Sequence, residues 1–158
     1  MKLFSNIFIS LFYSGYFKYA PGTFASLISI LILFPIVNLK LISIKLMILI
    51  FIALFIISIF FIKLYSTYTK THDSKIIVID EFLGIYLIFI FYELIFISNN
   101  FVTLTLIFML FRFFDITKIF PANLIDKKLK NSLGVLLDDL IASIYTVIVL
   151  YSVNVFIN

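Results

Sequence analysis

Long apolar runs follow one another along almost the whole chain, and they constrain its fold more than any other feature. Hydrophobic residues make up 64% of the 158 residues and charged residues 13%, whereas about 25% of the residues of a soluble domain are charged. No soluble core of this size could bury so many apolar side chains. We therefore expect a lipid bilayer to be the solvent for most of the surface, and residues 1–158 to form a single membrane domain.

Five apolar segments, separated by short polar or turn-forming stretches, follow an N-terminal region. They cover residues 24–39, 46–62, 82–97, 101–114 and 134–156. Three of them are shorter than about 17 residues, the lower limit for a helical span that averages roughly 20. We expect the ends of such short spans to pack within protein, or polar residues to continue the helix into the interface. Thr23, which follows the Pro21-Gly22 turn, is expected to cap the first helix.

The N-terminal region, residues 1–20, could be either a signal peptide or part of the folded protein. Its first 12 residues combine one lysine with a short apolar stretch, as a signal peptide does, but Tyr13-Ser14-Gly15-Tyr16 is a poor cleavage site. We expect this region to remain in the protein. A helix that lies in the membrane interface is an equally good interpretation of it.

Five spans place the loops alternately on two sides of the membrane. The N-terminal region and the loops at residues 63–81 and 115–133 share the first side. Ten of the 12 lysine and arginine residues lie there, and only Lys40 and Lys45 lie on the second side. Because cytoplasmic loops are enriched in lysine and arginine, we expect the first side to be cytoplasmic. No basic tract suits nucleic acid, so we expect no nucleic-acid partner.

The acidic residues are the most informative polar residues, because all of them except Glu93 lie at or near this first side. They are Asp73, Asp80, Glu81, Glu93, Asp115, Asp126, Asp138 and Asp139. A carboxylate within the membrane boundary costs a few kcal/mol unless it is paired or binds a metal. Several carboxylates from three helix ends would also repel one another. A divalent cation resolves both problems, and oxygen ligands select Mg²⁺, Mn²⁺ or Ca²⁺.

Each of these residues also has an ordinary structural interpretation. Asp80-Glu81 could favour a helix N-terminus as solvated acids. Arg112 stands three residues before Asp115, so it forms either a local ion pair or a planar fork for a phosphate. The single histidine, His72, lies in a polar loop and is expected to be solvated, and Glu93 is expected to have a packing or interfacial role.

Missing residues exclude several phosphatase chemistries. The chain has no cysteine and only one histidine, which excludes cysteine phosphatases and membrane phosphatases that need several histidines and arginines. No Asp-x-Asp sequence occurs, as aspartyl-phosphate enzymes of the haloacid dehalogenase type require. Water activated by a metal held by carboxylates is the remaining route to phosphate hydrolysis.

Four motifs, in this order and spacing, closely resemble the phosphatidylglycerophosphatase A family. They are PGTFASL at residues 21–27, IDEFLG at 79–84, FRFFDITKIFP at 111–121 and GVLLDDLIA at 134–142. The resemblance implies an all-α helical bundle in the bacterial inner membrane, multi-pass, with its active site facing the cytoplasm. It also implies a Mg²⁺-dependent hydrolase that converts phosphatidylglycerophosphate to phosphatidylglycerol and phosphate, the last step of phosphatidylglycerol synthesis.

The resemblance also implies roles for individual residues, carried over from the motifs. Asp80, Glu81, Asp115, Asp138 and Asp139 would form the acidic catalytic and metal site. Thr23, Arg112 and Lys118 would bind or orient the phosphate of the lipid substrate. His72-Asp73, ahead of the second motif, also looks like the family's pattern.

Two other functions stay open. One is a different enzyme of phospholipid headgroup chemistry, such as a CDP-alcohol phosphotransferase, although its long Asp-x-x-Asp-Gly signature is absent. The other is a carrier or channel for divalent cations, which predicts acidic residues through the whole depth of the bilayer. Release of CMP would favour the first, and ion flux without phosphate release would favour the second.

Overall fold

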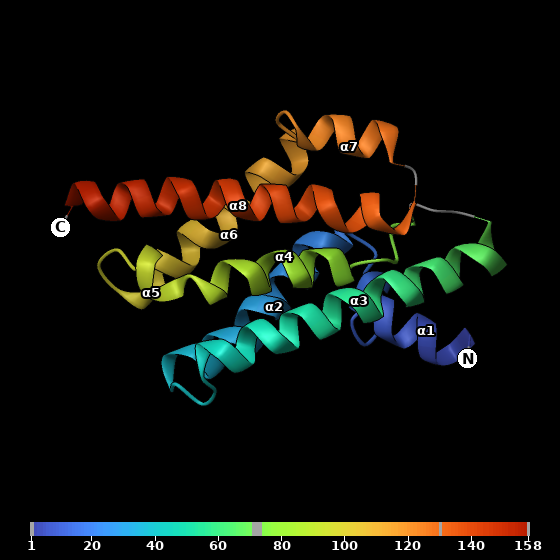
Figure 1. Cartoon of the computed structure of the whole chain (residues 1–158), viewed down its shortest axis with the longest axis horizontal. Helices are drawn as coiled ribbons and strands as arrows, with labels where there is room; N and C mark the ends of the chain where they lie inside the picture. Colours follow the sequence, from blue (N-terminus) through green and yellow to red (C-terminus); the bar gives the residue numbers. More distant parts are fainter. Residues whose placement is uncertain (1, 71–73, 130, 158) are drawn as a thin grey trace.

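The chain forms a bundle of helices, shown in Figure 1. The computed structural model describes residues 2–70, 74–129 and 131–157, with only the backbone described at 126–128, so His72 and Asp73 lie outside it. The elements are α1 (Lys2–Ile9), the short 3₁₀ helix η1 (Ser14–Tyr16), α2 (Pro21–Asn38), α3 (Ile44–Thr69), α4 (Ile79–Ile90), α5 (Tyr92–Ile95), α6 (Asn100–Thr117), α7 (Ala122–Lys128) and α8 (Ser132–Ile157). Within the described residues there is no strand, which confirms the expected all-α fold.

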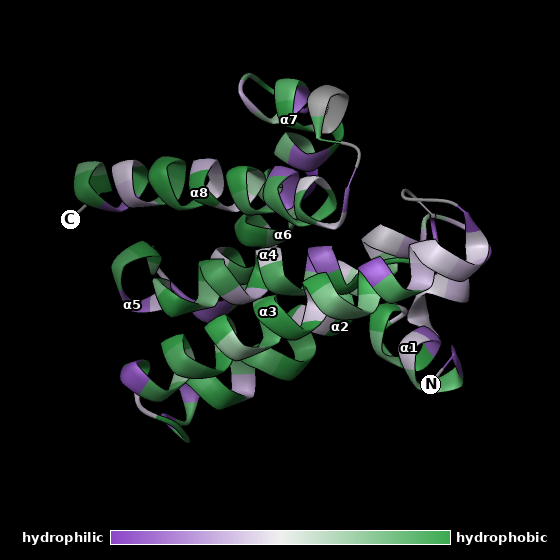
Figure 2. Cartoon of the chain, turned by 45° about the vertical axis from the view of Figure 1, so that its right-hand side comes forward, coloured by the Kyte–Doolittle hydropathy of each residue, from purple (hydrophilic) through white to green (hydrophobic). Residues whose placement is uncertain are grey.

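Four of these helices, α2, α3, α6 and α8, are long and apolar enough to cross a membrane. Helices α3, α6 and α8 extend beyond both ends of the apolar segments that predict them, whereas α2 extends beyond its segment only at the start. Large apolar side chains remain exposed on their outer faces, such as Leu49 and Ile56 on α3 and Ile148 on α8. Figure 2 shows mostly hydrophobic colouring along these helices. The protein is therefore a membrane protein whose outer surface suits lipid.

The third apolar segment, residues 82–97, does not form a lipid-facing span. It divides into α4, of 12 residues, and the four-residue α5, because Phe91 leaves the helical conformation (φ −101°, ψ 14°). Helix α4 packs against α2, α3 and α8, and side chains such as Leu83 and Ile88 are fully buried. A helix of this length spans only about 18 Å, less than the roughly 30 Å of hydrocarbon. The bundle supplies the apolar environment that its side chains need.

The helices alternate in direction, as the loop analysis expects. In Figure 1 the segments before α2, between α3 and α4 and between α6 and α8 lie toward one end of the bundle. We refer to this as the lysine-rich end. The α2–α3 connection, α5 and the C-terminus lie toward the other end, where Lys40 Nζ contacts Glu93 Oε1 at 3.2 Å. The Glu93 side chain is 78% exposed there, so it lies apart from the other described acids.

Local capping explains where two of the long helices begin. The Ser43 side chain accepts a hydrogen bond from the amide of Leu46 (3.4 Å), and Asn99 accepts one from Val102 (2.9 Å). The expected cap at Thr23 is wrong, because α2 already begins at Pro21. Proline suits a first helical position, since its fixed φ is helical and its missing N–H would have no partner there.

The N-terminal helix α1 docks on the end of α3. The Tyr68 hydroxyl donates to Asn6 Oδ1 at 2.7 Å, and the rings of Phe8 and Phe61 lie 5.0 Å apart. At eight residues, α1 is too short to span a membrane. Its C-terminal end is tied to the segment before α4, because the Val78 amide donates to the Ile9 carbonyl at 2.9 Å. This contact brings two loops of the lysine-rich end together.

A candidate active site at the lysine-rich end

A cavity of about 940 Å³ opens where the first turns of α2, α4 and α8 meet the last turns of α6. It is lined by Lys18, Ala20, Pro21, Gly22, Ser74, Lys75, Ile77, Asp80, Glu81, Arg112, Asp115, Lys118, Leu129, Asn131, Gly134, Val135, Asp138 and Asp139. All five carboxylates expected at the site are among them. Three helices that are distant in sequence, α4, α6 and α8, thus contribute polar side chains to one place, and α2 borders it with Pro21 and Gly22.

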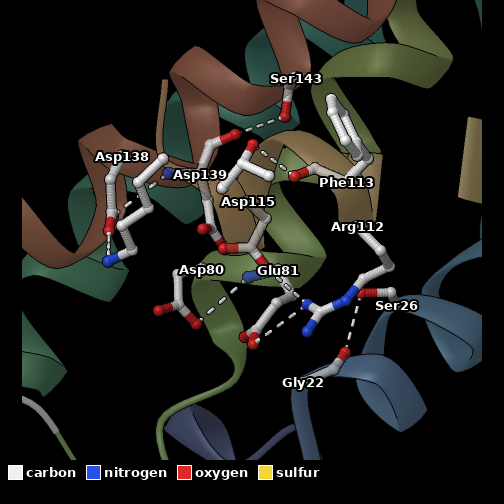
Figure 3. A network of polar contacts seen from close by, with 12 residues as sticks. Gly22, Ser26, Asp80, Glu81, Arg112, Phe113, Asp115, Asp138, Asp139 and Ser143 are labelled. Carbon is white, nitrogen blue, oxygen red and sulfur yellow. Dashed lines mark hydrogen bonds and ion pairs between the residues drawn. The ribbon is translucent and has the colours of Figure 1, made fainter. Parts of the chain in front are cut away.

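Three of the carboxylates form a close group, which we call the acid triad: Asp80, Glu81 and Asp139. One oxygen from each lies within 4.8 Å of the others. Asp80 and Glu81 occupy the first turn of α4, and Asp139, which is 4% exposed, lies in α8. Figure 3 shows these side chains pointing toward one another. Three negative charges so close and so little solvated would repel strongly, so the arrangement favours a bound cation or protonated carboxyl groups.

Arg112 of α6 lies beside the acid triad. Its Nη1 is 2.6 Å from Asp115 Oδ2 and 3.9 Å from Glu81 Oε1, and all three side chains are at most 16% exposed. The contact with Asp115 is the local i, i+3 ion pair that the spacing predicts. Its geometry is not that of a hydrogen bond, and Arg112 Nε and Glu81 Oε2 are also buried without a hydrogen-bond partner.

Buried polar atoms are normally hydrogen-bonded, so these unpaired atoms indicate a site that a bound group completes. Arg112 Nε, which has no hydrogen-bond partner among the described residues, is a donor suited to an anion. The unpaired carboxylate oxygen of Glu81 is an acceptor, suited to a cation or to a donor on a ligand. The site therefore offers positions for both signs of charge side by side.

Lys118 forms a second ion pair on the other side of the acid triad. Its Nζ lies 2.7 Å from Asp138 Oδ2, and its backbone adopts the left-handed conformation (φ 42°) that ends α6. Asp138 and Asp115 are thus each held by a cation of the protein, whereas the acid triad consists of the other three carboxylates. The structure brings all five expected acids to the cavity and places three within reach of one ion.

Gly22 allows α2 to approach this group closely. A Cβ atom at this position would overlap the Glu81 carboxylate and lie 3.2 Å from Arg112 Nη1. The Ser26 hydroxyl, one turn later, donates to the Gly22 carbonyl at 2.8 Å. The glycine of the first motif, expected only as part of a turn, is therefore a contact point of the site.

The structure differs from the expected site in two respects. Thr23 is half-buried in α2 but is not among the residues that line the cavity, so its role in phosphate binding stays a prediction. Lys18 and Lys75 do line it, although sequence analysis accounts for them only as topology signals. Their separation in sequence conceals this shared location.

Support for the acid triad comes from the neighbouring core. The Ser143 hydroxyl donates to the Asp139 carbonyl at 2.7 Å. Gly84 lies in α4, one turn after Asp80, and a Cβ there would meet the Phe111 ring of α6 at 2.7 Å and Ser143 Oγ of α8 at 2.9 Å. Helices α4, α6 and α8 therefore meet in close contact directly behind the carboxylates, which fixes the backbone that carries them.

Comparisons with known proteins identify the family of this chain. A family model described as phosphatidylglycerophosphatase A matches residues 7–154. A Haemophilus influenzae protein named phosphatidylglycerophosphatase A is 32% identical over 143 residues, which covers 90% of this chain and 84% of that protein. No solved structure matches the chain. The matched region includes every residue of the acid triad and both ion pairs.

Proposed function

Since this chain belongs to the phosphatidylglycerophosphatase A family and is a phosphatase, we propose that it hydrolyses the terminal phosphate of phosphatidylglycerophosphate in a Mg²⁺-dependent reaction at the acid triad. The reaction would yield phosphatidylglycerol and inorganic phosphate, the last step of phosphatidylglycerol synthesis. The observation that carries this proposal is the meeting of three carboxylates within 4.8 Å, beside Arg112, in one cavity.

The acid triad fits Mg²⁺ by its chemistry. All of its donors are carboxylate oxygens, the hard ligands that Mg²⁺ prefers, and one of them, Glu81 Oε2, is buried without a partner. Asp80, Glu81 and Asp139 would hold the ion. When bound, Mg²⁺ supplies positive charge against phosphoryl oxygens and makes water a better nucleophile. Asp115 and Asp138, the other two acids expected to bind metal, lie in the same cavity.

The basic residues give the cavity its affinity for phosphate. Carboxylates alone would repel the dianionic terminal phosphate, and Arg112 and Lys118 offset that repulsion from two sides of the triad. The ion pairs with Asp115 and Asp138 hold both cations in place before substrate arrives. Such preorganised charge stabilises a transition state more effectively than mobile charge. The pairs thus orient the groups that receive the phosphate.

The position of the cavity suits a lipid substrate. It opens at one end of the bundle, next to long apolar helices whose outer faces suit lipid. A headgroup can therefore enter while the acyl tails stay in the bilayer. The excess of lysine at this end supports a cytoplasmic orientation in the bacterial inner membrane.

The distribution of acids argues against a cation carrier. A carrier needs ligands along the path of the ion, across the depth of the bilayer. Among the acids whose side chains the structure describes, only Glu93 lies away from the cavity, and it is exposed at the far end beside Lys40. The described part of the bundle contains no second cluster of acidic residues that could bind a cation.

The test of this function is phosphate release from a defined lipid. Purified protein in neutral detergent micelles with Mg²⁺ should convert phosphatidylglycerophosphate to equal amounts of phosphatidylglycerol and inorganic phosphate. The same protein given phosphatidylglycerol should release none, because that lipid has no phosphomonoester. Absence of phosphate release would overturn the proposal. Release of CMP from a CDP-lipid, or ion flux in liposomes, would point to the two alternative functions.

A glycine substitution separates activity from folding. Gly22→Ala is expected to lower kcat/KM about a hundredfold, because the added methyl overlaps the Glu81 carboxylate and small displacements of reacting groups have effects of that order. The carboxylate ends a flexible side chain, so it moves aside and the fold persists. We expect a melting temperature within about 3 °C of wild type, since alanine also favours the helix.

Gly84→Ala is the comparison variant. Its added methyl meets the Phe111 ring and Ser143 Oγ in the core. We therefore expect its main effect to be a lower melting temperature, and not a lower kcat/KM of the folded protein. Thermal unfolding and phosphate release, measured on both variants, distinguish the two effects. Full activity in Gly22→Ala would show that the position of Glu81 does not matter.

A further inference from the structure

The cations of the cavity fall into two groups with different surroundings. Arg112 and Lys118 are each held by a carboxylate of the site, at 2.6 and 2.7 Å. Lys18 and Lys75 line the same cavity, are both exposed and have no ion-pair partner in the part of the chain that the structure describes. The Lys18 ammonium lies 5.7 Å from the centre of the Tyr19 ring. Among the described residues, no carboxylate therefore offsets these two positive charges of the cavity.

These two lysines come from loops that the fold holds together. Lys18 lies between η1 and α2, and Lys75 lies between α3 and α4. Gly15 packs so closely against the Ile76 carbonyl that a Cβ atom there would overlap it. The Val78–Ile9 hydrogen bond joins the same two stretches of chain. The lysines thus share one wall of the cavity, formed by elements other than the α6 and α8 helices that carry Arg112, Lys118 and Asp138.

The substrate of the proposed function also carries two anionic groups. Phosphatidylglycerophosphate has a terminal phosphomonoester and, across a three-carbon glycerol, a phosphodiester that joins it to the diacylglycerol. Phosphatidic acid has the monoester alone. A cavity of about 940 Å³ is at the upper end of the range for small-molecule sites, so it has room for both phosphates. Lysine ammonium groups bind phosphate as point charges, without the geometric demand of an arginine fork.

We propose that Lys18 and Lys75 bind the phosphodiester of the lipid headgroup while the acid triad, Arg112 and Lys118 receive its terminal phosphate. This inference rests on the proposed function and adds a basis for substrate selectivity. The lysine pair selects lipids with two phosphates over phosphatidic acid. It also fixes the direction of the headgroup in the cavity. The terminal phosphate points toward α8, and the glycerol linked to the tails lies by the loop before α2.

The test compares binding of the two phosphates in a double variant, Lys18→Gln/Lys75→Gln. With Mg²⁺ fixed and neutral detergent micelles, the KM for phosphatidylglycerophosphate should rise about tenfold, as loss of two exposed charge-assisted contacts predicts. The kcat should stay within about twofold, because the groups around the reacting phosphate are intact. Phosphatidic acid serves as a competitor, so that its Ki reports monoester binding whether or not it is hydrolysed, and that Ki should not change.

A matched control removes the same charge from the same end of the bundle. Lys63→Gln/Lys70→Gln changes two exposed lysines that do not line the cavity, and its KM should equal that of wild type. An unchanged KM in the Lys18/Lys75 variant overturns the inference. An equal rise in the Ki for phosphatidic acid also overturns it, because the lysines would then only attract anionic lipid in general. Wild-type protein that releases no phosphate would instead refute the proposed function.

Discussion

Asp139→Asn is expected to lower phosphate release about a thousandfold, the size of effect that loss of an essential charged group at a reaction centre produces. Asparagine has the shape of aspartate but lacks its charge and one acceptor. Asp139 is 4% exposed and its oxygen lies within 4.8 Å of those of Asp80 and Glu81. The substitution therefore weakens the triad as a cation site and changes little else. The measurement is inorganic phosphate released from phosphatidylglycerophosphate by purified protein.

Stability should move in the opposite direction from activity in this variant. Removing one of three neighbouring buried charges relieves repulsion, so the melting temperature without metal should equal or exceed that of wild type. Glu93→Gln is the control, because it makes the same chemical change at the far end, where the side chain is 78% exposed. It should keep activity within about twofold. An Asp139→Asn protein with wild-type activity would show that the acid triad is not the reaction centre.

Removal of divalent metal is expected to abolish activity, with a loss of at least about a thousandfold. Without a cation, the three carboxylates repel one another and also repel the phosphate of the substrate. Dialysis against a chelator followed by readdition of Mg²⁺ should restore full activity, and Mn²⁺ should restore part of it. Ca²⁺ should be a poor substitute, because it favours more ligands at longer distances than three converging carboxylates provide.

Binding of the ion can be followed without turnover. A ligand that binds only the folded state raises the melting temperature, so Mg²⁺ should stabilise wild-type protein by a few degrees and Asp139→Asn by less. This separates a metal required at the triad from a metal required only by the substrate. Undiminished activity in protein shown by elemental analysis to be metal-free would contradict the prediction.

Most of the architecture could be predicted from hydropathy and charge. The five apolar segments appear as helical segments, and the helices alternate in direction, whereas the membrane sides of the loops stay a prediction. The likeness to the phosphatidylglycerophosphatase A family, carried by four short motifs, is confirmed as well. The environment of α4 could not be predicted, because hydropathy records that a segment avoids water and not whether lipid or protein surrounds it. Its shortness was the only indication that its ends pack in protein.

The gathering of the acids in one place was predicted, but their pairing with basic residues was not. Sequence analysis treats Asp80, Glu81, Asp115, Asp138 and Asp139 as one group, whereas the structure separates an acid triad from two acids held by Arg112 and Lys118. The Arg112–Asp115 pair is local and follows from helix periodicity. The Lys118–Asp138 pair joins α6 to α8 and depends on how these helices pack. The location of Lys18 and Lys75 at the cavity could not be predicted for the same reason, because only the packing of the helices brings their two loops together.

The burial of α4 has a consequence for how the protein is made in the membrane. Twelve residues are too few to insert and span alone, so this helix must be accepted by partners that are already inserted or arrive later. Among the described helices that contact it, α8 comes latest in the sequence and brings Asp139 to Asp80 and Glu81. A nascent chain halted before α8 would carry only two of the three carboxylates of the acid triad. Under the proposed function, the reaction centre is therefore assembled only once α8 has been made and has packed against α4.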